Sequence, residues 1–304
     1  MGQSRGEILS TLIKVTVIIN VHNGEEFLMD AVNSVLNQKF ANFELLIWNN
    51  CSTDGTDEII QLVLKKDQRV HSHRTPIKTS LYKARNDAIA LSKGEYVAFL
   101  DSDDLWRDDK LSTSLSVLGE TSAEVFFSNF EIWNWENNSK RVAYKADLPR
   151  GLILNQLVRN YTVALSTLVF RRSILDTFKG PFNPTYSIIG DYDLVLRMAE
   201  QHQFASSNLP LTTYRVHDLN LSKLATARRK SEIKTWSTTS PLSKSADKGD
   251  YQKARASLLL DAALDDSSRP LIKLLGICKL LFTPGFINLL PSKFSWWASN
   301  NRRG

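Results

Sequence analysis

The 304-residue sequence is poor in cysteine and has no long uninterrupted hydrophobic run. Its two cysteines, Cys51 and Cys278, form neither a disulfide framework nor a CxxC metal pattern, so the sequence fits a reducing, cytoplasmic setting. No segment supplies the roughly 18 consecutive apolar residues that would predict a membrane-spanning helix. Residues 1–10 are polar and the apolar run from Leu12 is broken by Lys14, so we expect no signal peptide.

Glycine-rich phosphate-binding patterns are also missing. The first predicted strand, at residues 14–21, is followed by an isolated Gly24 rather than a GxGxxG turn, which argues against a dinucleotide-dependent dehydrogenase. A sugar-nucleotide pyrophosphorylase would need a glycine-rich loop with a basic residue to hold a triphosphate. That enzyme class is therefore a minor alternative.

The net charge of +6 is unevenly distributed. Residues 219–304 contain 15 Lys and Arg against 6 Asp and Glu, which leaves a net −3 for the rest of the chain. A basic segment with interrupted apolar stretches and paired tryptophans is compatible with peripheral contact of residues 271–304 with the inner face of a membrane. The alternative is a solvated helix packed on the domain's flank, and we expect no nucleic-acid partner.

Strands and helices alternate through the first hundred residues. Apolar runs predict strands at residues 14–21, 43–48, 70–74 and 96–100, and helical periodicity predicts helices at residues 24–38, 59–64 and 81–91. This alternation implies right-handed βαβ crossovers and a largely parallel sheet. Further on we expect a hairpin around residues 137–138, a strand at 163–170, a helix at 191–201 and an extended segment at 204–216.

Three carboxylates, Asp101, Asp103 and Asp104, close the fourth predicted strand. Two acids one residue apart at a buried strand end repel each other unless a cation lies between them. Mg²⁺ or Mn²⁺ suits this position, because such ions take oxygen ligands and are shared with substrate phosphates. The alternative is that Asp103 or Asp104 caps a following helix, and we expect Asp104 to cap one that opens at residues 105–110.

Taken in order, these segments resemble the inverting glycosyltransferases of family 2. The matching segments are residues 17–25, 34–38, 43–47, 49–56, 84–86 and 94–104, with weaker matches at 168–172, 190–194 and 214–217. The resemblance implies an α/β GT-A fold with a Rossmann-like, mostly parallel central sheet flanked by helices. It also implies a leader (1–13), a glycosyltransferase domain (14–220) and a basic, mostly helical extension (221–304). Within the domain, residues 14–104 form the nucleotide-sugar half and residues 105–220 the acceptor half.

The reaction that the resemblance implies is metal-dependent transfer of a sugar, with Mn²⁺ or Mg²⁺ as cofactor. The donor is a UDP-, dTDP- or GDP-linked sugar, and the acceptor is a hydroxyl of a glycan or lipid-linked molecule in cell-surface polysaccharide or glycolipid synthesis. Asp191 matches the catalytic base, although it could also cap its helix. Asp101, Asp103 and His217 are the implied metal ligands.

The residues implied to bind the nucleotide sugar are His22, Asn23, Glu25, Asn49, Asn50, Arg85 and Asp101. Asn49 and Asn50 depart from the family, whose members carry at least one Asp here; an amide still accepts a hydrogen bond but loses the charge and adds two donors. Gly190 stands where many relatives have an acid. These departures are the support for a second alternative, a non-catalytic sugar-nucleotide-binding module. The joint retention of Asp101, Asp103, Asp191 and His217 argues against it.

Overall fold

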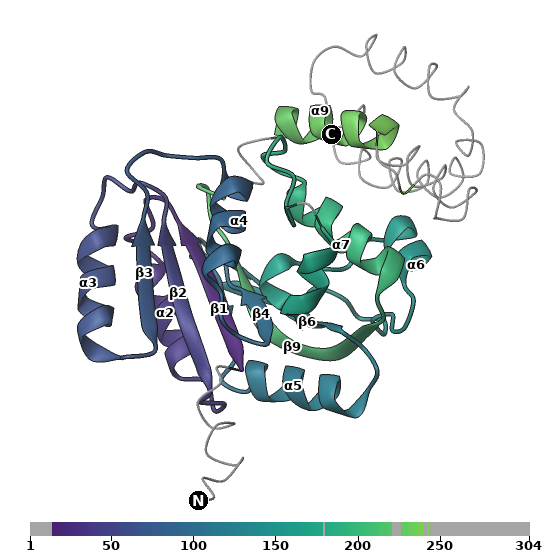
Figure 1. Cartoon of the computed structure of the whole chain (residues 1–304), viewed down its shortest axis with the longest axis horizontal. Helices are drawn as coiled ribbons and strands as arrows, with labels where there is room; N and C mark the ends of the chain where they lie inside the picture. The colour runs from purple at the N-terminus through teal and green to yellow at the C-terminus, as the bar shows by residue number, and fades with distance from the viewer. Residues whose placement is uncertain (1–13, 179, 221–225, 240–241, 243–304) are drawn as a thin grey trace, which may run out of the picture. The chain divides into compact units, whose positions relative to one another are not determined.

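The computed structural model describes residues 14–178, 180–220, 226–239 and 242, and the chain divides into two units (Figure 1). One unit comprises residues 1–152 and 162–224, and the other comprises residues 153–161 and 225–304. The second unit contains the described helices α6 (Leu154–Arg159) and α9 (Thr226–Thr239). The leader at 1–13, most of the basic extension and the membrane contact expected at 271–304 lie outside the described residues.

The described part of the first unit is built on one nine-stranded sheet of order β3-β2-β1-β4-β8-β6-β9-β5, with β7 paired to β6. The strands are β1 (Val15–Val21), β2 (Phe43–Asn49), β3 (Val70–Arg74), β4 (Tyr96–Phe99), β5 (Leu105–Trp106), β6 (Val125–Asn134), β7 (Ser139–Val142), β8 (Val169–Arg171) and β9 (Phe204–Val216). The helices are α2 (Leu28–Leu36), α3 (Thr56–Lys66), α4 (Leu81–Leu91), α5 (Lys110–Glu120) and α7 (Gly190–Gln201), with 3₁₀ turns η1 (Leu165–Thr167) and η2 (Arg172–Thr177).

Strands β3, β2, β1 and β4 are parallel neighbours, so their carboxyl ends meet at one edge of the sheet. Their residues are almost all buried, except along β3, because helices cover both faces. Val17 and Ile19 of β1 belong to a core that includes Val32 of α2 and Ile60 of α3. Helix α4 covers the opposite face (Figure 1). The predicted α/β fold, with parallel strands over residues 14–104, is confirmed.

The second half of the sheet corrects two predictions. Residues 105–110 do not open a helix: Leu105 and Trp106 pair with β9, and α5 begins only at Lys110. The strand expected at 163–170 is replaced by η1 and the short β8. Both segments are held by distant partners that local periodicity does not reveal, whereas the predicted hairpin is confirmed as β6 and β7. None of the described helices is long and apolar enough to cross a bilayer.

A lysine lies in the core of this second half. Lys110 is fully buried at the start of α5, and its Nζ donates to the carbonyl oxygen of Thr167 at 2.5 Å. The same Nζ lies 4.9 Å from the centre of the Phe126 ring. Burial lowers the pKa of Lys110 well below its ordinary value, and the hydrogen bond to Thr167 ties the amine to η1.

Lys110 should therefore give the folded protein a distinctive alkaline stability profile. Between its lowered folded pKa and the ordinary 10.5, the unfolded chain binds a proton that the folded chain does not, so the free energy of unfolding rises with pH. We predict that denaturant unfolding of wild type gains about 1.4 kcal/mol per pH unit relative to Lys110→Met across this window. Parallel profiles for the two proteins would contradict it.

Candidate functional site

Two loops interlock at the carboxyl ends of β1 and β2. The side chain of Asn23 accepts a hydrogen bond from the Thr53 N–H at 2.9 Å, and the Asn23 N–H donates to Ser52 Oγ at 2.9 Å. Asn23 has a φ of 55°, a left-handed conformation that asparagine tolerates well. Glu25 Oε2 accepts from the Gly55 N–H at 2.6 Å, and His22 Nδ1 lies 3.0 Å from the Asn50 carbonyl oxygen. These predicted nucleotide-site residues therefore brace the strand-end loops.

Asn49 and Asn50 are both buried and both engaged within the protein. Asn49 Nδ2 donates to Asp57 at 2.6 Å, and its Oδ1 accepts from the Ser52 N–H. Asn50 Nδ2 donates to the Thr79 carbonyl oxygen at 2.9 Å, while its Oδ1 accepts from the Thr79 N–H at 2.9 Å. An ionised carboxylate can only accept, so an aspartate at position 50 would lose the hydrogen bond to the Thr79 carbonyl.

Arg85 links α4 to the end of β4. Its guanidinium is 6 % exposed, and Nη2 donates to Asp101 Oδ1 at 2.6 Å. The Asp101 side chain stays 40 % exposed, so part of the carboxylate faces solvent. Arg85 does not use the surface acids Asp87 and Glu95 as partners. Asp87 pairs with Lys83, and Glu95 pairs with Lys14 and Arg171.

Asp103 lies against His217, which follows the end of β9. His217 Nε2 is 3.0 Å from Asp103 Oδ2, and Asn220 Nδ2 donates to the same oxygen at 3.1 Å. Burial raises the pKa of Asp103 above its ordinary value, the charge of Asp101 adds to this, and the hydrogen bond from His217 opposes it. Two residues 114 positions apart in the sequence are thus brought into contact, as the resemblance implies.

Asp104 does not cap a helix, and that prediction is wrong. Its carboxyl is buried, where Oδ2 accepts from Ser166 Oγ at 2.7 Å and Oδ1 accepts from the Arg215 N–H at 3.1 Å. Burial and then the charges of Asp103 and Asp101 raise its pKa well above the ordinary value. Asp104 therefore ties the end of β4 to η1 and β9, and it is not open to a ligand.

Asp191 lies in the first turn of α7 and remains partly exposed. It is not the helix cap, because the cap residue is Ile189. Tyr82 Oη donates to Asp191 Oδ1 at 3.2 Å. Burial raises the pKa of Asp191 above its ordinary value, while the charge of Arg85 and the hydrogen bond from Tyr82 lower it. Asp193 instead binds Arg197 one turn along the helix at 2.9 Å.

The residues present fit a divalent cation only in part. The described residues contain no group of three or more His, Cys, Asp or Glu side chains placed to hold a metal ion. His217 Nε2 and Asp103 Oδ2 lie 3.0 Å apart, so a carboxylate oxygen and an imidazole nitrogen, both groups that could bind such a cation, face each other here. Asp103 and His217 thus suit two coordination positions, while the carboxylate of Asp101 is directed to Arg85.

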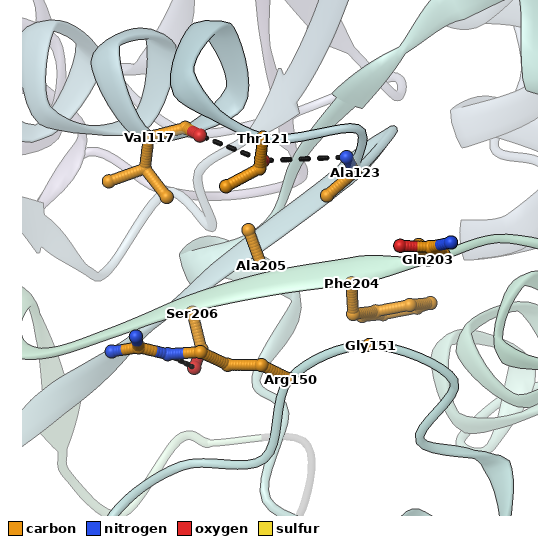
Figure 2. Close-up of a pocket in the computed structure, with 9 residues that line it drawn as sticks. All are labelled: Val117, Thr121, Ala123, Arg150, Gly151, Gln203, Phe204, Ala205 and Ser206. Carbon is orange, nitrogen blue, oxygen red and sulfur yellow. Dashed lines mark hydrogen bonds between the residues drawn. The ribbon is translucent and has the colours of Figure 1, made fainter.

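A cavity of about 170 Å³ lies elsewhere in this unit, lined by the end of α5, the loop at Arg150 and Gly151, and the start of β9 (Figure 2). Arg150 Nε donates to Ser206 Oγ across it at 3.3 Å. The cavity is smaller than a usual ligand pocket, and His217 follows the opposite end of β9. None of the predicted site residues lines it.

Comparison with known proteins identifies the family. Residues 16–178 match the model of glycosyl transferase family 2. The chain belongs to this family. A relative from Escherichia coli, the UDP-Glc:alpha-D-GlcNAc-diphosphoundecaprenol beta-1,3-glucosyltransferase WfgD, is 32% identical over 169 residues, which cover 55% of this chain and 64% of WfgD. The chain spans somewhat less than two thirds of the length of the first curated relatives it matches.

Solved structures show the same fold at low sequence identity. Residues 1–349 of Staphylococcus aureus TarS, crystallised with UDP-GlcNAc, have a TM-score of 0.70 at 16% identity, covering 89% of this chain and 81% of that TarS fragment. The mannosyltransferase PcManGT from Pyrobaculum calidifontis, in complex with GDP-Man and Mn²⁺, has a TM-score of 0.59 at 15% identity, covering 95% of this chain and 84% of PcManGT. These likenesses confirm the GT-A type architecture.

Sequence reasoning missed three residues that hold the predicted site together. Tyr82 contacts Asp191, Ser166 binds Asp104, and Asn220 binds Asp103. Asn220 follows His217 by three residues and its Oδ1 accepts from the His217 N–H at 2.6 Å, a local turn that the sequence could have suggested. Tyr82 and Ser166 carry no such signal, because their partners are remote in sequence.

The role of Asn50 can be tested by a single-atom change. Asn50→Asp removes the donor to the Thr79 carbonyl and places a carboxylate beside it, so we predict a loss of about 1–3 kcal/mol in the free energy of unfolding. Asn33→Asp makes the same change on the exposed side of α2 and should cost less than about 0.5 kcal/mol. Equal stabilities for the two variants in urea unfolding would refute the assignment.

Proposed function

We propose that this chain transfers a sugar from a nucleotide-diphosphate donor to an acceptor hydroxyl, with inversion at the anomeric carbon. The observation that carries this proposal is that Arg85 binds one motif carboxylate while its charge acts on a second, from a different motif. Arg85 binds Asp101 directly, and its charge together with that of Asp101 acts on Asp191. The end of β4 and the start of α7 therefore bring their charged side chains close together. A transferase needs such closeness, because it must hold the sugar donor and the sugar acceptor side by side.

Asp191 is the proposed general base. In a single displacement, its carboxylate takes the proton of the acceptor hydroxyl while the acceptor oxygen bonds to the anomeric carbon and the bond from that carbon to the diphosphate breaks. A pKa raised by burial brings the base closer to working pH and strengthens it as a proton acceptor. The rate should fall as the pH drops through this raised pKa, because the protonated carboxyl cannot accept.

Asp103 and His217 are the proposed protein ligands of a Mn²⁺ or Mg²⁺ ion. When bound, such an ion would offset the negative charge that develops on the departing diphosphate. The raised pKa of Asp103 supports this role, since a carboxylate crowded by Asp101 in a buried setting gains from a nearby cation. Asp101, held in place by Arg85, would then lie beside the bound donor.

The acceptor is proposed to be a lipid-linked or glycan hydroxyl in cell-surface polysaccharide synthesis. This rests on the name of WfgD, which specifies a saccharide on diphosphoundecaprenol as acceptor. The donor base is proposed to bind beside the loops that follow β1 and β2, where the implied nucleotide-site residues brace each other. A screen of UDP, dTDP and GDP by thermal shift would identify the base.

Removing the Asp103 carboxylate should abolish cation-dependent nucleotide binding. A nucleoside diphosphate at about 100 times its dissociation constant stabilises the protein by about 2.7 kcal/mol, which a thermal-shift assay detects. We predict that Asp103→Ala loses the part of this stabilisation that depends on Mn²⁺. Asp108→Ala, which removes an exposed carboxylate paired with Lys39, should retain it. Equal Mn²⁺-dependent shifts in the two variants would count against the cation site.

Replacing the proposed base should separate binding from chemistry. Asp191→Asn keeps the shape of the side chain but cannot accept the acceptor's proton, so we predict a fall in kcat of about 10² to 10⁴ with donor binding unchanged. The control is Asp193→Asn, two residues further along α7 than Asp191. It weakens the ion pair with Arg197 and should lower stability while leaving transfer measurable. If Asp191→Asn transfers sugar at the wild-type rate, the base lies elsewhere.

A further inference from the structure

Tyr82 occupies a position that the family resemblance does not explain. Its side chain is 1 % exposed, although it lies in the first turn of α4. The ring stacks on Phe182, with centroids 5.4 Å apart and planes 18° apart. The guanidinium carbon of Arg85 lies 5.5 Å from the ring centroid. The tyrosine is thus fixed between an aromatic ring and a buried cation, and its hydroxyl points at Asp191.

Gly190 and Tyr82 form a matched pair. A Cβ at position 190 would lie 2.6–2.7 Å from three atoms of the Tyr82 ring, far closer than such contacts allow. The ring cannot move aside cheaply, because Phe182 packs against it. The glycine therefore lets the phenol lie across the start of α7, where its Oη reaches Asp191 Oδ1.

The groups around Asp191 make this contact consequential. From α4, Tyr82 and Arg85 face it; from the end of β4, Asp101 acts on it; and from α7 itself, the Tyr192 N–H supports it. Among these groups, Tyr82 is the side chain that donates a hydrogen bond to the Asp191 carboxylate. Burial and the charge of Asp191 raise the pKa of Tyr82 well above its ordinary value, so the phenol stays protonated and donates.

We propose that Tyr82 is a positioning residue for Asp191: its ring sets the entry of α7 through Gly190, and its hydroxyl orients the carboxylate and keeps it ionised. The catalytic meaning of this role rests on the proposed function, because only a transferase needs a base at Asp191. The contact itself does not, since it can be measured in the free protein. A phenol that merely filled space would leave the ionisation of Asp191 unchanged.

The test is a carboxyl titration of the 304-residue chain by NMR with ¹³C-labelled aspartate, with the Asp191 signal assigned by its absence in Asp191→Asn. Tyr82→Phe keeps the ring and removes the donor, so the pKa of Asp191 should rise by about one unit. Tyr96→Phe removes the hydroxyl of another buried tyrosine, at the opposite end of β4 from Asp101, and should leave the titration unchanged. Coincident Asp191 titrations in wild type and Tyr82→Phe would overturn the proposal.

If Tyr82→Phe does not fold, Gly190→Ala tests the same contact by changing the residue that the Tyr82 ring packs against. The added methyl must displace the phenol ring, so the pKa of Asp191 should again rise, and an unchanged titration would again overturn the proposal. In transfer assays, Tyr82→Phe should move the acid limb of kcat upward by the same amount with the donor KM unaltered. Absence of transfer by the wild type would refute the proposed function, while the titration would still decide the role of Tyr82.

Discussion

The ion pair between the buried Arg85 and the partly exposed Asp101 is the contact on which the rest of this site depends. The Arg85 guanidinium lies beside the rings of Tyr82 and Phe182 and is a fixed positive charge at the carboxyl edge of the parallel strands. It binds Asp101 directly, and its charge lowers the pKa of Asp191 against the effect of burial. Without Arg85, burial would raise the pKa of Asp191 further.

The three acids that close β4 have different hydrogen-bonding partners although they are neighbours in sequence. Asp101 binds Arg85, and Asp103 binds His217 and Asn220. Asp104 is buried and binds Ser166 and the backbone of Arg215. Because Asp104 anchors the loop from both η1 and β9, the other two carboxylates are held apart. A strand end rich in acids is thus divided into a structural anchor, a partner for an arginine and a candidate ligand for a cation.

Sequence predicted the parallel half of the fold well, because apolar runs and helical periodicity are local signals; α4 begins and ends at the residues expected. It failed where distant strands decide the outcome, as at Leu105 and Trp106, which pair with β9 instead of opening a helix. Motif matching selected Asp101, Asp103, Asp191 and His217, whose roles stay predictions. It could not select Tyr82 or Ser166, since their meaning lies in contacts across about 60 or more residues.

The most direct test of this division of roles is a crystal structure with a nucleoside diphosphate and Mn²⁺, in which anomalous scattering locates the metal. We expect a single manganese peak on the diphosphate, with Asp103 and His217 as its protein ligands and Asp101 still held by Arg85. A manganese ion bound away from Asp103, or a diphosphate held with both Asp103 and His217 turned from it, would contradict the account.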